Sequence, residues 1–364
     1  MENDILNASN CAVILVNYKN TEDTLQCLES LFGLHHLPAH IFVVDNASTA
    51  ESMGELYDGW AHLCAARGLQ TPECISAPSA GVSAHPAIAD ADAAASAASI
   101  PAADSVPRFA LLPQQENLGF SGGNNKALSL LLVSSCQAFW LLNNDTTVDP
   151  FALDALCAAM NAEQGMGLCG STVVYAAKPY RLQCAAGGKL CPLTGKTSFI
   201  HENMPLAELA AHAKAAPAVA LDWILGCSLF IRRSAVQAIG LLPEEYFLYY
   251  EDVAYSCLAR RRGFQLGWAG ESIVYHKEGG STGAKSRQGA TLPVRSLLMD
   301  YLSIRNRLYL LRIFYPWSLP VTVASLCGVF CNRLRRGQAN RLPTIVRAAW
   351  DGLCKNMGFP ASKP

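Results

Sequence analysis

Short apolar runs alternate with segments of helical periodicity in the first part of the chain. Four runs are almost entirely apolar: residues 11–17, 41–44, 109–112 and 138–142. Continuous apolar runs of this length are typical of strands buried on both faces of a parallel sheet. The pattern therefore predicts a parallel sheet whose strands are separated by helices.

Large apolar residues recur at helical spacing after the first run, up to Phe32, so an amphipathic helix is expected there. Asn20 is the predicted N-cap, with Asp23 reaching back to it. The same periodicity predicts helices near residues 53–64 and 297–311. Further helices are expected near 123–133, at 150–164, where Pro150 can open the helix, and at 252–262.

Residues 70–107 interrupt this alternation with alanine, serine and proline and almost no large apolar side chains. Such a segment cannot bury enough surface to offset the entropy of ordering it, so we expect a flexible insertion. Beyond it, strands are predicted at 166–174, 218–231 and 273–275, with a glycine-rich hairpin around Gly187, Gly188 and Gly195.

Polar residues follow three successive predicted strands. Asp45 and Asn46 follow the second strand, residues 117–119 the third and residues 143–145 the fourth. Turn chemistry explains any one of these groups. Ligands of open parallel sheets bind at the carboxyl ends of the strands, so three groups at one edge favour a shared ligand site.

The segment 117–125, NLGFSGGNN, brings three glycines between a strand and a helix. Missing β-carbons there would let backbone N–H groups approach a phosphate or a sugar. The segment is neither a GxGxxG motif nor a P-loop, which argues against a dinucleotide dehydrogenase and a P-loop NTPase.

Asp145 and Asn143 are two residues apart at a strand end, and their oxygens suit Mg²⁺ or Mn²⁺ together with a diphosphate. The alternative is an Asx turn.

Glu251 and Asp252 begin a predicted helix behind aromatic residues, where they either complement the helix dipole or have raised pKa values suited to a general base. His276 is a metal ligand or a structural histidine.

Composition narrows the functional classes. With 28 basic and 29 acidic residues, the chain has no global basic field of the kind that binds nucleic acid. The fourteen cysteines are scattered and form no CxxC pair, so we expect them reduced and acting as apolar fillers. The first ten residues predict no signal peptide. A mean hydropathy of +0.17 with 16% charged residues points instead toward a membrane surface.

An ordered set of seven motifs resembles the family 2 glycosyltransferases, in particular their bacterial rhamnosyltransferase-like branch. The motifs are VILVNYKN, IFVVDNAS, NLGFSGGNN, WLLNNDTTVDP, GCSLFIRR, FLYYEDVAYSCLARRRG and VYHKEGGS. The resemblance runs from Cys11 to Ser281 without the insertion. It implies a GT-A fold, a Rossmann-like α/β domain with a mostly parallel central sheet and helices on both faces, and inversion at the anomeric carbon.

The resemblance also implies roles for single residues. By motif position, Asp252 is similar to the family's general base, and Trp223 and Glu251 would line the acceptor side. Asp145 and His276 match its metal ligands. The implied nucleotide-sugar site consists of Asn17, Asp45, Asn117, Gly119, Gly123, Asn124, Asn143 and Asp145.

Two features depart from the family pattern. Asn143 stands where many relatives have the first acid of a DxD motif, which weakens the anionic shell of the ion and leaves the dependence on Mg²⁺ or Mn²⁺ open. The alanine-rich insertion lies where relatives have a short connection, and we expect it to be dispensable.

The C-terminal segment is predicted to be helical and membrane-associated. Twenty residues between Arg312 and Arg333 have no formal charge, but Pro316 and Pro320 weaken a spanning helix, so a helix in the membrane interface fits better. The alternative is a hairpin packed on the catalytic domain. Arg305, Arg307 and Arg312 would reach a diphosphate, a lipid head group or only water.

These patterns predict a catalytic domain at 1–290 and a helical region at 291–364. We expect an inverting enzyme that moves a sugar, such as L-rhamnose, from a dTDP- or UDP-sugar donor to a lipid-linked or polysaccharide acceptor in cell-envelope glycan synthesis. The expected location is the cytoplasm, peripheral on the inner face of the cytoplasmic membrane. The alternative is a non-catalytic scaffold subunit with the same fold. A sugar nucleotidyltransferase is disfavoured because no basic, glycine-rich N-terminal loop is present.

Overall fold

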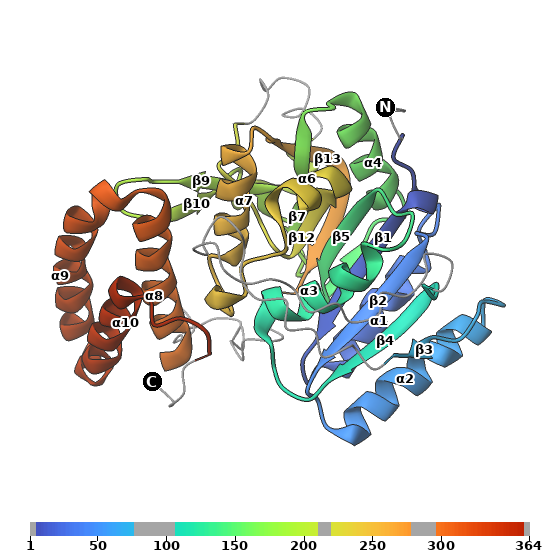
Figure 1. Ribbon diagram of the computed structural model, residues 1–364, viewed down its shortest axis with the longest axis horizontal. Coiled ribbons are helices and arrows are strands. Elements are labelled where there is room, and N and C mark those ends of the chain that lie inside the picture. Colours follow the sequence, from blue (N-terminus) through green and yellow to red (C-terminus); the bar gives the residue numbers. More distant parts are fainter. Residues whose placement is uncertain (1–4, 76–105, 210–219, 278–295, 360–364) are drawn as a thin grey trace.

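A twisted, mostly parallel sheet forms the centre of the molecule (Figure 1). The computed structural model describes residues 5–75, 106–209, 220–277 and 296–359. Within these ranges the sheet has ten strands in the order β3-β4-β2-β1-β5-β12-β7-β13-β6, with β8 paired to β7. Its strands are β1 Cys11–Asn17, β2 His40–Asn46, β3 Glu73–Cys74, β4 Phe109–Gln114, β5 Ala138–Asn143, β6 Thr146–Val148, β7 Met166–Tyr175, β8 Leu182–Ala185, β12 Ser228–Arg232 and β13 Gln265–His276.

Helices cover both faces of this sheet, and a small second sheet lies at its side (Figure 1). The second sheet contains β9 Gly187–Leu190, β10 Thr197–Phe199 and β11 Trp223–Ile224. The α-helices are α1 Thr21–Leu31, α2 Ala50–Ala65, α3 Gly119–Leu131, α4 Ala152–Ala162, α6 Arg233–Ile239, α7 Glu251–Arg261, α8 Leu297–Phe314, α9 Leu319–Arg335 and α10 Leu342–Cys354.

Successive residues of β1 belong to two different hydrophobic cores, as the two-residue period of a strand requires. Ile14 packs in the core shared with α3, α7 and α8. Its neighbours Val13 and Leu15 pack in the other core, with α1, α2 and α4. The strand is therefore buried on both sides, which explains why its sequence is a continuous apolar run. The predicted α/β class with helices on both faces of a mostly parallel sheet is confirmed.

The strand register places the predicted polar groups at one edge of the sheet. Asn17 pairs with Asp45 across β1 and β2, and Val16 pairs with Asn143 across β1 and β5. All three strands are parallel, so their carboxyl ends meet at the same edge. This is where open α/β sheets bind ligands.

Three predictions of local structure are wrong. The helix expected at 123–133 begins at Gly119, so most of the NLGFSGGNN segment is helical rather than a loop. The strand expected at 218–231 is two strands, β11 and β12, that belong to different sheets. Residues 73–74, assigned to the insertion, form β3, which pairs in parallel with β4. Residues 76–105 of that insertion lie outside the described residues.

The helices α8, α9 and α10 form a group beside α7 and the second sheet (Figure 1). Tyr309 and Leu310 of α8 are buried in the main core, and Thr322 of α9 donates to the carbonyl oxygen of Leu193 at 2.9 Å. Large apolar side chains on the outside of this group remain exposed: Trp317, Val321, Val323, Leu334, Val346, Trp350 and Phe359. None of the described helices is both long enough and apolar enough to cross a membrane.

Candidate active site

Asn17 and Asp45 form a buried pair at the ends of β1 and β2. The side-chain amide of Asn17 donates to Asp45 Oδ1 at 2.6 Å, and the backbone N–H of Ser48 donates to Asp45 Oδ2 at 2.9 Å. Asn17 Oδ1 accepts hydrogen bonds from Thr24 Oγ1 and the backbone N–H of Asn20. This second bond fixes the start of α1, where Asn20 is the N-cap as predicted. The Asn20 side-chain amide donates to Asp23 Oδ2 at 2.5 Å and makes no hydrogen bond to the backbone of the helix. The pair thus ties two strand ends and a helix together.

The glycines of the NLGFSGGNN segment permit close packing within the protein. Gly119 has φ +71°, and a β-carbon there would lie 2.3 Å from the carbonyl oxygen of Phe247. A β-carbon on Gly123 would lie 2.9 Å from Val16 Cγ1. Asn117 Oδ1 accepts the N–H of Gly119 at 2.9 Å, and Asn124 Nδ2 donates to the carbonyl oxygen of Phe120. These contacts bring α3 against β1 and against the loop that precedes α7.

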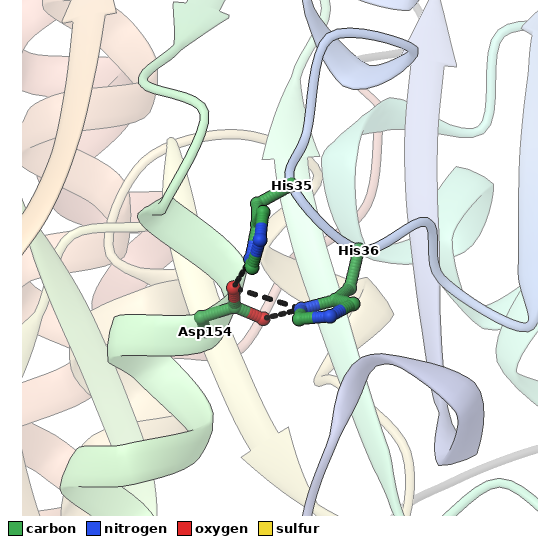
Figure 2. A group of neighbouring side chains, drawn as sticks. All are labelled: His35, His36 and Asp154. Carbon is green, nitrogen blue, oxygen red and sulfur yellow. Dashed lines mark hydrogen bonds and ion pairs between the residues drawn. The ribbon is translucent and has the colours of Figure 1, made fainter.

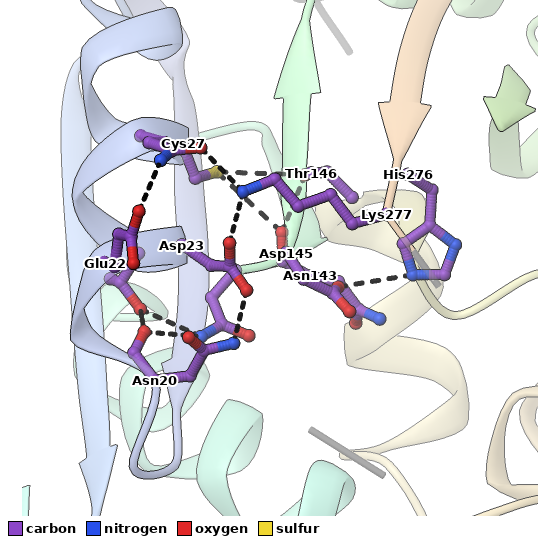
Figure 3. A network of polar contacts seen from close by, with 12 residues as sticks. Asn20, Glu22, Asp23, Cys27, Asn143, Asp145, Thr146, His276 and Lys277 are labelled. Carbon is purple, nitrogen blue, oxygen red and sulfur yellow. Dashed lines mark hydrogen bonds and ion pairs between the residues drawn. The ribbon is translucent and has the colours of Figure 1, made fainter. Parts of the chain in front are cut away.

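Asp145 and His276 lie side by side, as predicted for a pair of metal ligands (Figure 3). His276 Nε2 is 3.2 Å from Asp145 Oδ1, and both residues are buried. The other ring nitrogen, Nδ1, is 2.8 Å from Gln183 Oε1, which accepts its proton. With its proton on Nδ1, His276 has a lone pair on Nε2 that could bind a cation. His276 Nε2 and Asp145 Oδ1 are close enough for both atoms to coordinate one cation.

Lys277 and α1 form a polar network beside this pair (Figure 3). Lys277 Nζ binds Asp23 and donates to Gln26 Oε1 at 2.6 Å. Its backbone N–H donates to the carbonyl oxygen of Asp145 at 3.0 Å. Asn143, the last residue of β5, lies next to Asp145 in the same region. The network fixes the end of β13 to the first turns of α1.

The two carboxyl groups at the start of α7 have different environments. Asp252 Oδ2 accepts the backbone N–H of Gly226 at 3.0 Å, and Oδ1 accepts that of Val253 at 2.8 Å. Burial raises the pKa of Asp252 to about 6, although these N–H groups favour its charged form. Burial, with the neighbouring charge of Asp252, raises the pKa of Glu251 well above its usual value. Of these two adjacent carboxyl groups, Asp252 is therefore the more readily ionised, and Glu251 holds its proton more tightly.

The loop before Asp252 has a strained backbone held by α8. Phe247, Tyr249 and Tyr250 all have positive φ, at 64°, 70° and 70°, although none is glycine. Asn306 Nδ2 donates to three carbonyl oxygens of this loop, those of Tyr246, Leu248 and Tyr249, at 2.7–2.9 Å. Such strain persists only where surrounding contacts determine the conformation.

The arginines of α8 contact the protein itself. Arg305 is 1% exposed, and its guanidinium donates to the carbonyl oxygens of Tyr246 and Gly358. Arg312 donates to the carbonyl oxygen of Leu353. Arg307 is 8% exposed and its aliphatic chain lies against Gly195. A role of these arginines toward phosphate or lipid stays a prediction.

Trp223, predicted on the acceptor side, is 4% exposed and lies in the main core. Its ring centroid is 5.6 Å from that of Phe199, and its indole N–H donates to the carbonyl oxygen of Lys189 at 3.3 Å. The assigned role of Trp223, like the roles of the nucleotide-sugar residues, stays a prediction.

Sequence reasoning missed three residues that orient the site. Gly226 binds Asp252, Gln183 binds His276, and Asn306 holds the loop before α7. Gly226 lies within the GCSLFIRR motif, which contributed to the family resemblance but did not indicate a role for this glycine. Gln183 lies in the short stretch LQCA and Asn306 lies between Arg305 and Arg307, and neither residue had a distinguishing pattern.

The fold is that of the GT-A glycosyltransferases. GalNAc-T7, solved with UDP, GalNAc and Mn²⁺, superposes with a TM-score of 0.56 over 97% of this chain and 55% of its own, at 12% identity. The mannosyltransferase PcManGT of Pyrobaculum calidifontis, solved with GDP-Man and Mn²⁺, covers 97% of this chain and 89% of its own, at 14% identity and a TM-score of 0.46.

Sequence comparison gives a more specific likeness. An N-acetylglucosaminyl-diphospho-decaprenol L-rhamnosyltransferase of Mycobacterium tuberculosis is 26% identical in an alignment 198 residues long, which covers 49% of this chain and 61% of the relative. The match thus spans less than two thirds of the relative's length. No family model matches the chain. Fold and sequence together support a family 2-like glycosyltransferase.

Proposed function

We propose that the protein is an inverting glycosyltransferase that uses Asp252 as its general base. An acceptor hydroxyl is a weak nucleophile, and a carboxylate with a pKa of about 6 is ionised at neutral pH while still able to hold a proton. Asp252 would remove the hydroxyl proton as the oxygen attacks the anomeric carbon from the face opposite the nucleoside diphosphate. The new glycosidic bond forms as the bond to the diphosphate breaks, and the proton remains on Asp252.

The observation that most supports this function is the difference between the two adjacent carboxyl groups. Backbone N–H groups of Gly226 and Val253 favour the charged form of Asp252, whereas Glu251 Oε2 is buried without a hydrogen-bond donor. Because the pKa of Glu251 is raised further above its ordinary value, Glu251 adds less negative charge beside the base. This arrangement allows one carboxylate to act as a base without the mutual repulsion of two.

Asp145 and His276 would hold a divalent cation, Mg²⁺ or Mn²⁺, whose charge offsets that of the departing diphosphate. Their 3.2 Å separation and the Nδ1 hydrogen bond to Gln183 fit ligands of one ion. Asn143 adds an amide oxygen in place of a carboxylate, so the donor set has a single acid. The nucleotide-sugar residues proposed nearby are Asn17, Asp45, Asn117, Gly119, Gly123, Asn124, Asn143 and Asp145.

The mycobacterial relative suggests the substrates. By analogy with its name, we propose an L-rhamnosyl donor such as dTDP-rhamnose and a lipid-linked diphosphate sugar as acceptor. Trp223 and Glu251 are proposed to shape the acceptor side. The apolar residues exposed on α9 and α10 support a peripheral position at a membrane surface, where such an acceptor is held.

The test is transfer by the purified chain from a panel of dTDP- and UDP-sugars to polyprenyl-diphosphate-linked acceptors, with Mn²⁺ present. We expect transfer with inverted anomeric configuration, and its loss in Asp252→Asn without loss of donor binding. Unchanged transfer by Asp252→Asn would refute the assignment of the base. Donor binding by calorimetry without turnover on any acceptor would instead favour a non-catalytic scaffold.

A further inference from the structure

Three potential metal ligands meet on the surface, away from the carboxyl ends of the strands (Figure 2). His35 and His36 lie in the loop that leads from α1 to the amino end of β2, and Asp154 lies in the first turn of α4. In the part of the chain that the structure describes, this is the one group of three His, Cys, Asp or Glu residues whose ligand atoms lie within 4.8 Å of one another.

The distances within the group match those between neighbouring ligands of one metal ion. His35 Nδ1 is 3.0 Å from Asp154 Oδ2, and His36 Nδ1 is 3.1 Å from the same oxygen and 3.2 Å from Oδ1. Two atoms bound at about 2.0–2.1 Å from an ion, at octahedral or tetrahedral angles, lie roughly 2.8–3.4 Å apart. Both rings direct Nδ1 at the carboxylate (Figure 2).

The protein holds this group in place from both sides. Leu34 is buried and Leu37 packs against the same core, so the dipeptide between them is anchored at each end. The backbone N–H of His35 donates to the carbonyl oxygen of Pro150 at 2.8 Å, which fixes the loop to the residues preceding α4. Little chain entropy therefore remains to be lost when an ion binds.

The geometry points to a site for a divalent transition-metal ion, with Nδ1 of His35, Nδ1 of His36 and the Asp154 carboxylate as ligands. Two imidazoles and one carboxylate suit Zn²⁺, Co²⁺ or Ni²⁺ rather than Mg²⁺. The side chains are 52%, 62% and 32% exposed, so an ion reaches them and water completes its coordination. The ion would fasten the loop between α1 and β2 to α4. This site is independent of the proposed transferase function and of Asp145 and His276.

Titration of the full-length, reduced protein with Co²⁺ and Zn²⁺ in excess Mg²⁺ tests the site. The excess Mg²⁺ keeps Co²⁺ out of oxygen-rich sites. The spectrum of bound Co²⁺ identifies its ligands, because thiolate ligands give an intense near-ultraviolet charge-transfer band that imidazole and carboxylate ligands do not give. We expect about one Co²⁺ bound without that band, and a Kd at least tenfold higher in His36→Ala and Asp154→Ala. Zn²⁺ should raise Tm in the wild type and not in these variants.

The matched control is His62→Ala, which removes an exposed histidine of α2 outside the group and should bind Co²⁺ like the wild type. The substituted residues His36, Asp154 and His62 are exposed or half-exposed, and circular dichroism checks that each variant is folded. Equal Co²⁺ affinity in the wild type, His36→Ala and Asp154→Ala would overturn the proposal. Cys327 and Cys331 are exposed and one turn apart on α9, so they could bind Co²⁺ through their thiolates. A thiolate band that disappears in the double variant Cys327→Ser, Cys331→Ser would therefore also overturn the proposal.

Discussion

The side-chain amide of Asn306 donates to the carbonyl oxygen of Tyr249 at 2.7 Å, three residues before Asp252. The contact joins α8, in the C-terminal helical group, to the strained loop that precedes the proposed base. The C-terminal helices are thus part of the structure that positions Asp252, in addition to any role at a membrane.

Asn306→Ala removes the donor to three loop carbonyls. We expect the free energy of unfolding to fall by about 1–3 kcal/mol, because buried carbonyl groups lose their partner. We also expect kcat to fall more than KM changes, since Asp252 would lose its fixed position. Urea unfolding and steady-state kinetics measure the two effects. Asn356→Ala, which removes a hydrogen bond to Asp351 elsewhere in the C-terminal group, is the control. A kcat equal in both variants would contradict the positioning role.

Asp252→Asn should reduce transfer by about 10²–10⁴-fold, the usual contribution of a general base. Donor affinity should stay within a few fold, because the base acts on the acceptor. Single-turnover transfer and calorimetry with the donor give the two values. Loss of donor binding along with transfer would show that Asp252 acts mainly in the nucleotide-sugar site.

The pH dependence of kcat/KM should report Asp252. Since its pKa is about 6 and the base must be ionised, kcat/KM should fall tenfold per pH unit below about pH 6 and level off above it. A rate profile from pH 4.5 to 8.5 in the wild type measures this limb. A flat profile across pH 6 would contradict the assigned base.

The same pKa predicts an effect on stability with a defined sign. Folding raises the pKa of Asp252 from 3.8 to about 6, so the folded state holds the proton more tightly than the unfolded state. The resulting stabilisation is present below about pH 4 and is lost as pH rises through 6. Between pH 5 and 7 the wild type should therefore lose more unfolding free energy than Asp252→Asn, measured by urea titration. A larger loss in the variant would reverse the sign and refute the shift.

Gln183→Ala should weaken Mn²⁺ binding about 10–100-fold, because His276 would lose the acceptor that fixes its tautomer. Gln183→Glu keeps an acceptor and should restore most of the affinity. Electron paramagnetic resonance of free Mn²⁺ in the presence of donor measures both. Equal affinity in the wild type and Gln183→Ala would argue against His276 as a ligand.

Trp317→Glu and Trp350→Glu should weaken binding to anionic lipid vesicles, since these side chains are 64% and 66% exposed. Vesicle co-sedimentation measures the bound fraction. Phe151→Glu, at an exposed aromatic residue before α4, is the control because it lies outside the C-terminal helices. Binding lost equally in the control, or absent in the wild type, would contradict a membrane surface role for these helices.

Periodicity alone located most elements, because burial on both faces leaves a continuous apolar run and burial on one helix face leaves a 3.6-residue period. The run at β1 and the helix at α1 are examples. Motif order gave the family resemblance and the pairing of Asp145 with His276, although 131 positions separate the two residues.

Local pattern could not give the contacts made across the fold. From the sequence, Gly119 is expected to be a flexible loop glycine. Its left-handed conformation and its close approach to the carbonyl oxygen of Phe247 depend on residues far away in the chain. Asn306, Gln183 and the positive φ of Tyr249 and Tyr250 are likewise tertiary properties. A sequence fixes which residues are apolar, small or ionisable. Which polar groups become partners, and how far burial shifts the pKa of Asp252, depends on atoms brought close only by folding.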